Sequence, residues 1–194
     1  MPSPDLRRRA VRLELLTLGS VSIEAIVALI AGLAARSIAL VSFGLDSVIE
    51  FLAALVVLWQ LRTGSERRED AALKVVAATF VAFAAYVIAE SQDTLRHHHR
   101  PETSAVGIVL TVASLIVMQW LGKAKRQVGH EIANDALEAD AAETLFCSYL
   151  AALVLVGLIL NAAFGWWWAD PVAALGVALL AIREGWEAWT GGHH

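Results

Sequence analysis

The sequence predicts an all-α integral membrane protein with six transmembrane helices and both termini in the cytoplasm. Of the 194 residues, 58% are hydrophobic and 18% are charged, whereas soluble domains average about a quarter charged residues. The apolar residues form blocks of about 20, which is the length that crosses a bilayer as a helix. Lys and Arg are spread unevenly over the breaks between these blocks, which indicates an orientation.

The apolar segments are separated by polar or charged breaks, namely TGSERRED, LRHHHRPETS, GKAKRQ and GWWWADP. Pro171 suits the first turn of the last helix, and Asp170 suits its N-cap position. The basic N-terminus runs into the first segment without a clear cleavage site, so we expect a retained helix rather than a signal peptide. We expect one transmembrane domain over residues 1–194, with no soluble C-terminal domain. The predicted helices cover residues 13–35, 38–61, 71–91, 104–121, 134–164 and 170–189.

The orientation follows from the basic residues and the tryptophans. With the N-terminus inside, 12 of the 15 Lys and Arg residues fall on the cytoplasmic side, and only Arg36, Arg96 and Arg100 fall outside. Trp166, Trp167 and Trp168 then lie at the outer interface, with Trp186 and Trp189 at the inner one, the two depths that indole rings prefer. The compact chain suggests the bacterial inner membrane. A net charge of -4 does not suggest a nucleic-acid partner.

Two pairs of polar residues interrupt the apolar segments at the spacing of one helical turn. Asp46 and Glu50 lie in the second segment, and Glu143 and Cys147 lie in the fifth. Residues at i and i+4 share one face of a helix. An ionisable group in the membrane interior costs a few kcal/mol or more, so it usually faces a partner, a cavity or an ion path. We expect the two pairs to meet near the bilayer midplane.

Three carboxylates and a thiol would supply four oxygen and sulfur ligands to one divalent cation, with Zn²⁺ the first candidate. Without a cation, the three carboxylates would repel one another and take up protons, so a metal would enter by displacing protons. We place no Lys or Arg at mid-membrane to neutralise these acids. The single Cys excludes an intrachain disulfide and any CxxC metal motif.

These motifs resemble those of the cation diffusion facilitator family of divalent metal efflux transporters. The stretch SIALVSFGLDSVIE is similar to the family's S-x-A-L opening and liganding pair on the second helix. The stretch ALEADAAETLFC resembles the family's A-L-x-A-D-x-x-H-x-x-x-D on the fifth, with Glu143 in the His place and Cys147 in the last Asp place. Ala169, Asp170 and Pro171 open the sixth helix as in the family.

The resemblance implies a short form of the family that exports Zn²⁺ in exchange for protons, with Asp46, Glu50, Glu143 and Cys147 as metal ligands. Because the usual pairs contain Asp and often His, Co²⁺, Fe²⁺, Cd²⁺ and Mn²⁺ stay open as alternatives. The metal is cargo, and no resident cofactor is expected. Any homodimer would be held by membrane helices.

Other polar residues have a functional and a purely structural interpretation. Glu24 is a proton carrier or accessory ligand, or a protonated acid bonded to a neighbouring helix. Asp140 relays cations beside the site, a role implied by the resemblance, or pairs near the interface. We expect the run His97, His98 and His99 to be a solvated outer loop, because three adjacent side chains do not converge well on one ion. Gly19, Gly32, Gly157 and Gly176 are expected to allow close helix packing, and His193 and His194 are assigned no role.

Three alternative functions remain open from the sequence. A membrane enzyme would use Cys147 as its nucleophile, but it lacks a nearby basic partner, because His130 is expected in the loop before the fifth helix. A structural or sensor protein would use the acids only for packing. A proton channel would be unaffected by metal.

Overall fold

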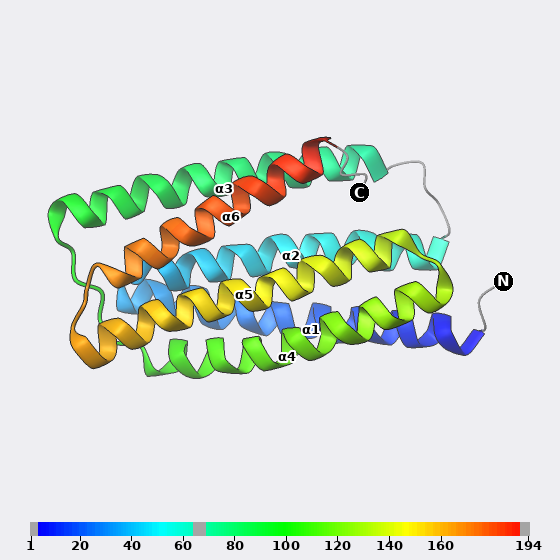
Figure 1. The fold of residues 1–194 in the computed structure, drawn as a ribbon, viewed down its shortest axis with the longest axis horizontal. Helices are drawn as coiled ribbons and strands as arrows, with labels where there is room; N and C mark the ends of the chain where they lie inside the picture. Colours follow the sequence, from blue (N-terminus) through cyan, green and yellow to red (C-terminus); the bar gives the residue numbers. More distant parts are fainter. Residues whose placement is uncertain (1–3, 64–68, 191–194) are drawn as a thin grey trace.

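The computed structural model describes residues 4–63 and 69–190, and within that part the chain consists of six α-helices and no strands (Figure 1). The prediction of an all-α fold with six helices is therefore confirmed. The helix bounds are α1 Pro4–Ala35, α2 Ile38–Thr63, α3 Glu69–His97, α4 Ala105–Ile132, α5 Asp135–Phe164 and α6 Ala169–Thr190.

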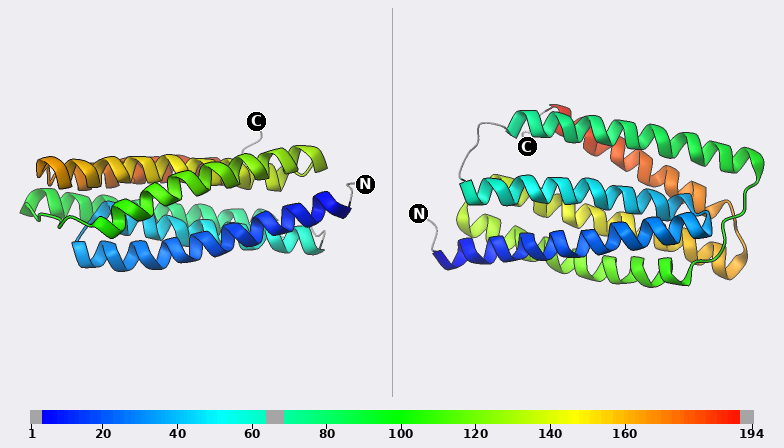
Figure 2. Two further views of the ribbon diagram at one scale, coloured as in Figure 1. Left: turned by 90° about the horizontal axis from the view of Figure 1, so that it is seen from below. Right: turned by 180° about the vertical axis from the view of Figure 1, so that it is seen from behind.

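The helices pack side by side as an elongated bundle, with successive helices running in opposite directions (Figure 1). The closest pairs are α4 with α5, α1 with α2, and α3 with α6. In Figure 1, α5 lies in front of α2 and α6 in front of α3, and the view from behind in Figure 2 reverses this order. The α2–α5 contact brings together the two helices that carry the predicted ligands.

Within the described residues, four helices are long and apolar enough to cross a membrane, over Asp5–Ala35, Ile38–Trp59, Ala105–Ile132 and Leu137–Phe164. Their outward faces carry exposed apolar side chains such as Ile23, Ile30 and Val109, which would face lipid. The composition and the bundle thus describe a membrane protein. That α3 and α6 also cross the membrane remains a prediction. The cytoplasmic location of both termini remains one too. The start of α1 and the end of α6 do lie toward the same end of the bundle (Figure 1).

Three helices are longer than predicted. α1 begins at Pro4 instead of residue 13, and α3 runs to His97 instead of residue 91, so His97 lies in a helix and not in the expected loop. The third, α4, matters most for the site. α4 runs through the basic stretch GKAKRQ, which we expected to be a break, and continues to Ile132. His130 therefore lies in the last turn of α4 instead of in a loop. Ala133 adopts a left-handed conformation with φ 49°, and the Asn134 side chain accepts a hydrogen bond from the Leu137 N–H and starts α5. The left-handed turn at Ala133 therefore ends α4, and the basic residues of the GKAKRQ stretch do not.

A further correction concerns Asp170, which we expected to cap α6. The structure places it inside the first turn of α6, with its carboxylate at the beginning of α2. There it accepts hydrogen bonds from the N–H groups of Ile38 (2.9 Å) and Ala39 (3.2 Å), and from the Ser37 hydroxyl. A buried carboxylate on α6 therefore satisfies the first donors of α2, a role that local sequence patterns do not reveal.

Close helix contacts depend on glycine. A Cβ on Gly44 would lie 3.0 Å from the Leu29 backbone nitrogen, and one on Gly32 would lie 2.8 Å from that of Val41, so both glycines let α1 and α2 approach. Gly157 and Gly176 likewise face side chains across the α5–α6 contact, as predicted. Gly19 has nothing within 4 Å of its Cβ position, so the prediction of close packing there was wrong.

Candidate metal site

The predicted ligands lie on the facing sides of α2 and α5, inside the bundle. Asp46, Glu50 and Cys147 are each at most 4% exposed, and Glu143 is partly buried. The Cys147 thiol donates a hydrogen bond to Oδ2 of Asp46, with 3.4 Å between Sγ and the oxygen. This contact joins positions 101 residues apart in the chain and aligns the two helices at similar depth.

The other two predicted ligands belong to the same group. Glu50 has both carboxylate oxygens buried, and neither has a partner at hydrogen-bonding geometry in the described part of the chain. Glu143 lies close enough to Asp46 and Glu50 to interact electrostatically with both. Buried carboxylates are normally satisfied by a hydrogen bond, a counter-charge or a metal ion. The group therefore combines several buried acidic side chains with carboxylate oxygens that are available as ligands.

The four candidate ligands lie near one another, but their ligand atoms do not converge on a single point. Among the described residues, the only group with three ligand atoms all within 4.8 Å of one another lies elsewhere, on Asp93, His97 and His99. A divalent ion on the α2–α5 group would have to draw the side chains inward, because ligand atoms around tetrahedral Zn²⁺ at bond lengths of about 2.0–2.3 Å lie about 3.5 Å apart. Long, flexible Glu side chains allow such an adjustment.

A buried cation lies beside this group, which the sequence analysis missed. Lys125 of α4 is completely buried; its Nζ pairs with Asp140 of α5 and lies 3.5 Å from Oε2 of Glu14 on α1. The Thr144 hydroxyl accepts a further hydrogen bond from Nζ at 3.2 Å. We expected Lys125 in a solvated cytoplasmic break, and its sequence context, GKAKRQ, does not distinguish it from the exposed Lys123.

The ion-pair cluster of Glu14, Lys125 and Asp140 carries two acids against one base. Asp140 lies three residues before Glu143, one helical turn nearer the α4–α5 connection, and Lys125 also acts electrostatically on Glu50 and Glu143. Oδ1 of Asp140 and both Glu14 oxygens have no hydrogen-bond partner among the described residues. The cluster thus joins three helices at one end of the candidate site.

Glu24 of α1 lies on the other side of Glu50, close enough to act on it electrostatically. Its carboxylate accepts hydrogen bonds from the hydroxyls of Ser47 on α2 (2.9 Å) and Ser114 on α4 (2.6 Å). Both oxygens are thereby occupied, unlike those of Glu50. These contacts support the structural interpretation, in which Glu24 links neighbouring helices. A role as a direct metal ligand would require those hydrogen bonds to break.

The remaining candidates lie at the ends of the bundle. His130 is exposed, with its Nδ1 3.6 Å from a carboxylate oxygen of Glu138. Cys147 instead lies in the interior of the bundle, where its thiol donates a hydrogen bond to Asp46 and not to His130. His97 and His99 approach Asp93, whereas the ring of His98 lies against that of Trp167, with 5.1 Å between centroids. His193 and His194 lie outside the described residues.

Comparison with known proteins agrees with this architecture. Residues 15–189 match the family described as the cation efflux transmembrane domain, so the match spans all six helices. The chain is also 25% identical over 168 residues to an uncharacterized transporter of Synechocystis sp., an alignment that covers 81% of this chain and 52% of the relative. The chain therefore spans about half the length of the curated relative that it matches.

Proposed function

Since the chain belongs to the cation efflux transmembrane domain family, whose members transport metal cations, we propose that it carries a divalent metal ion through the α2–α5 group. The ligands in this proposal are Asp46, Glu50, Glu143 and Cys147. The observation that supports this proposal most directly is the hydrogen bond between Cys147 and Asp46 across the two helices. Beside it lies Glu50, whose buried oxygens have no partner at hydrogen-bonding geometry among the described residues.

Zn²⁺ is the first candidate for the cargo, because it accepts both thiolate and carboxylate ligands in a four-coordinate site. A purely oxygen-based site would suit Mg²⁺ or Mn²⁺ better, and the thiol of Cys147 moves the preference toward softer ions. The proposed location is the bacterial inner membrane, with export from the cytoplasm as the direction of net transport.

Protons are the proposed counter-substrate. Three acids and a thiol that are close together in a buried site hold protons when no metal is present, because their charges repel and water is excluded. A divalent ion stabilises the deprotonated forms, so metal loading releases protons and proton binding expels the metal. Alternating exposure of this fixed site to the two sides would couple the two fluxes.

The test is Zn²⁺ flux in proteoliposomes that contain the purified full chain, with and without an imposed pH gradient. We expect gradient-dependent flux in the wild type and none in Asp46→Ala, with Gly19→Ala as the matched control because its site is open. If Zn²⁺ gives no flux, Mn²⁺, Fe²⁺ and Co²⁺ are tested next. Flux of no ion, or wild-type flux in Asp46→Ala, would contradict the proposal.

A further inference from the structure

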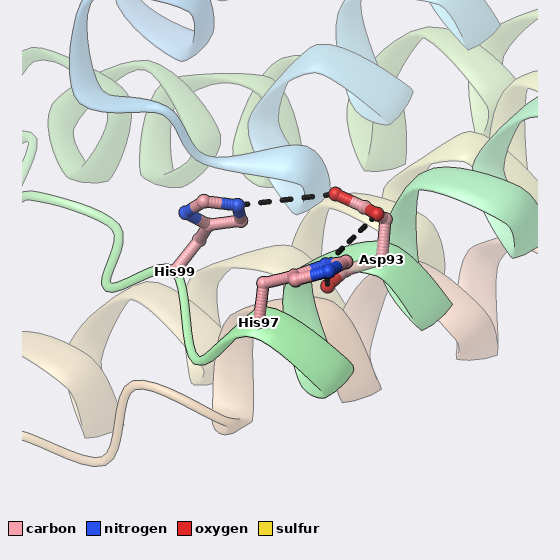
Figure 3. A group of neighbouring side chains, drawn as sticks. All are labelled: Asp93, His97 and His99. Atoms are coloured by element: carbon pink, nitrogen blue, oxygen red, sulfur yellow. Dashed lines mark hydrogen bonds and ion pairs between the residues drawn. The ribbon is translucent and has the colours of Figure 1, made fainter.

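Three potential metal ligands converge at the end of α3, far along the chain from the α2–α5 group. Figure 3 shows the imidazoles of His97 and His99 turned toward the carboxylate of Asp93. Nδ1 of His97 lies 3.0 Å from Oδ1 of Asp93, and Nε2 of His99 lies 3.9 Å from Oδ2. One ligand atom from each of the three residues lies within 4.8 Å of the other two.

The backbone explains how these side chains meet. Asp93 and His97 are four residues apart on α3 and therefore share a face. His98 adopts the left-handed conformation with φ 54°, which ends the helix and folds the chain back. The His99 N–H then bonds to the Thr94 carbonyl at 3.2 Å, which holds His99 over the last turn and beside Asp93.

Hydrogen bonding alone does not explain all of this geometry. The His97–Asp93 approach is an ordinary i, i+4 contact, but 3.9 Å between His99 and Asp93 is too long for a hydrogen bond. Around a tetrahedral ion with bonds of about 2.0–2.2 Å to nitrogen and oxygen, ligand atoms lie about 3.4 Å apart. The two observed separations bracket that spacing, although they end on different oxygens of the Asp93 carboxylate. Since one ligand atom from each residue lies within 4.8 Å of the other two, an inward shift of the side chains would bring three atoms onto one ion.

We propose that Asp93, His97 and His99 form a second metal site, which binds a divalent transition ion such as Zn²⁺, Co²⁺, Ni²⁺ or Cu²⁺. Two imidazoles and one carboxylate suit ions of this class rather than Mg²⁺ or Ca²⁺. All three side chains are more than half exposed, so water completes the coordination and the ion exchanges with solvent. By the predicted orientation, this site lies on the outer side of the membrane.

The test measures Zn²⁺ binding by equilibrium dialysis of the purified full chain, in an Asp46→Ala/Cys147→Ser background that disables the α2–α5 group. This background keeps the result independent of the proposed transport function. We expect His97→Ala and His99→Ala each to weaken one Zn²⁺-binding step at least tenfold. His98→Asn is the matched control, because His98 points to Trp167 and Asn tolerates a left-handed backbone.

A second readout distinguishes ligand loss from misfolding. Cu²⁺ bound to the same background should show coupling to two imidazole nitrogens in electron paramagnetic resonance, and one nitrogen after either alanine substitution. Circular dichroism checks that the variants keep their helices. The proposal would be overturned if His97→Ala and His99→Ala bind Zn²⁺ like the background protein, or if His98→Asn weakens binding as much as they do.

Discussion

At the scale of single residues, Cys147 is the feature that sets the α2–α5 group apart from an all-carboxylate site. It is the only thiol in the chain, and its Sγ lies 3.4 Å from Asp46. A buried Cys is often only a small apolar residue, but here it faces three acids. Its chemistry therefore bears on which ion the protein selects.

We predict that Cys147→Asp keeps transport but shifts the preference toward harder ions such as Mn²⁺, because an oxygen replaces the sulfur ligand. Cys147→Ala removes the ligand and should weaken Zn²⁺ transport by more than about tenfold, the lower end of what losing a supporting group costs. Competition between Zn²⁺ and Mn²⁺ in proteoliposomes measures the shift. Equal selectivity in wild type and Cys147→Asp would show that the thiol is not a ligand.

Lys125 also matters at this scale, because two acids depend on it for charge compensation. Removing one partner of a buried ion pair lowers the free energy of unfolding by about 3–5 kcal/mol, because the remaining charge is buried without a counter-charge. We predict that Lys125→Met lowers the thermal unfolding temperature in detergent, and that adding Glu14→Gln and Asp140→Asn restores most of the loss. Lys123→Met, at an exposed position on the same helix, is the control. A triple variant as unstable as Lys125→Met would contradict the ion-pair account.

At the scale of helices, the junction between α6 and α2 joins residues that lie far apart in the chain. Asp170 and Ser37 are 133 residues apart, yet their side chains close the N-terminus of α2 together. These hydrogen bonds tie the beginning of α2 to α6. Since α2 carries Asp46 and Glu50, the cap lies on the helix that holds two of the proposed metal ligands.

We predict that Asp170→Ala destabilises the protein by about 1–3 kcal/mol, because three donors lose their acceptor. Asp170→Asn keeps one carbonyl acceptor and should lose less. Thermal unfolding in detergent measures both, with Glu102→Ala as the control, because that side chain is exposed near the same end of the bundle. An Asp170→Ala protein with wild-type stability would refute the capping role.

The helices show what sequence patterns can and cannot predict. Apolar blocks of about 20 residues located all six helices, because burial in lipid leaves a strong compositional signal. They did not locate the end of α4, since a basic stretch such as GKAKRQ is as compatible with a helix as with a loop. The true end depends on Ala133 in a left-handed conformation, and Ala carries no sequence signal for that state.

The same contrast holds for the candidate site. The i, i+4 pairs on α2 and α5 can be read directly from the sequence, and the structure brings them together. The ion-pair cluster could not be predicted, because it joins Glu14, Lys125 and Asp140 from three helices. The Asp93, His97 and His99 cluster was also missed: the expectation that adjacent histidines diverge holds for His98, but a backbone reversal returns His99 to Asp93.

At the scale of the whole molecule, the orientation in the membrane decides which site faces which compartment. We predict that, in a Cys147→Ser background, Glu102→Cys reacts with a membrane-impermeant maleimide added to intact cells, because the predicted orientation places the α3–α4 connection outside. Lys123→Cys, toward the other end of α4, should react only after the membrane is permeabilised. The reverse pattern would invert the topology and the assignment of the Asp93 site to the outer side.

Titration with Co²⁺ shows whether a metal ion binds between α2 and α5 with Cys147 as a ligand. Cobalt bound to a thiolate gives a near-ultraviolet charge-transfer band, and Cys147 is the only thiol that can produce it. We predict a saturable band when the wild-type protein is titrated with Co²⁺, lost in Cys147→Ser, weakened in Asp46→Ala and unchanged in His97→Ala. Absence of the band in the wild-type protein, or its full persistence in Asp46→Ala, would contradict the account.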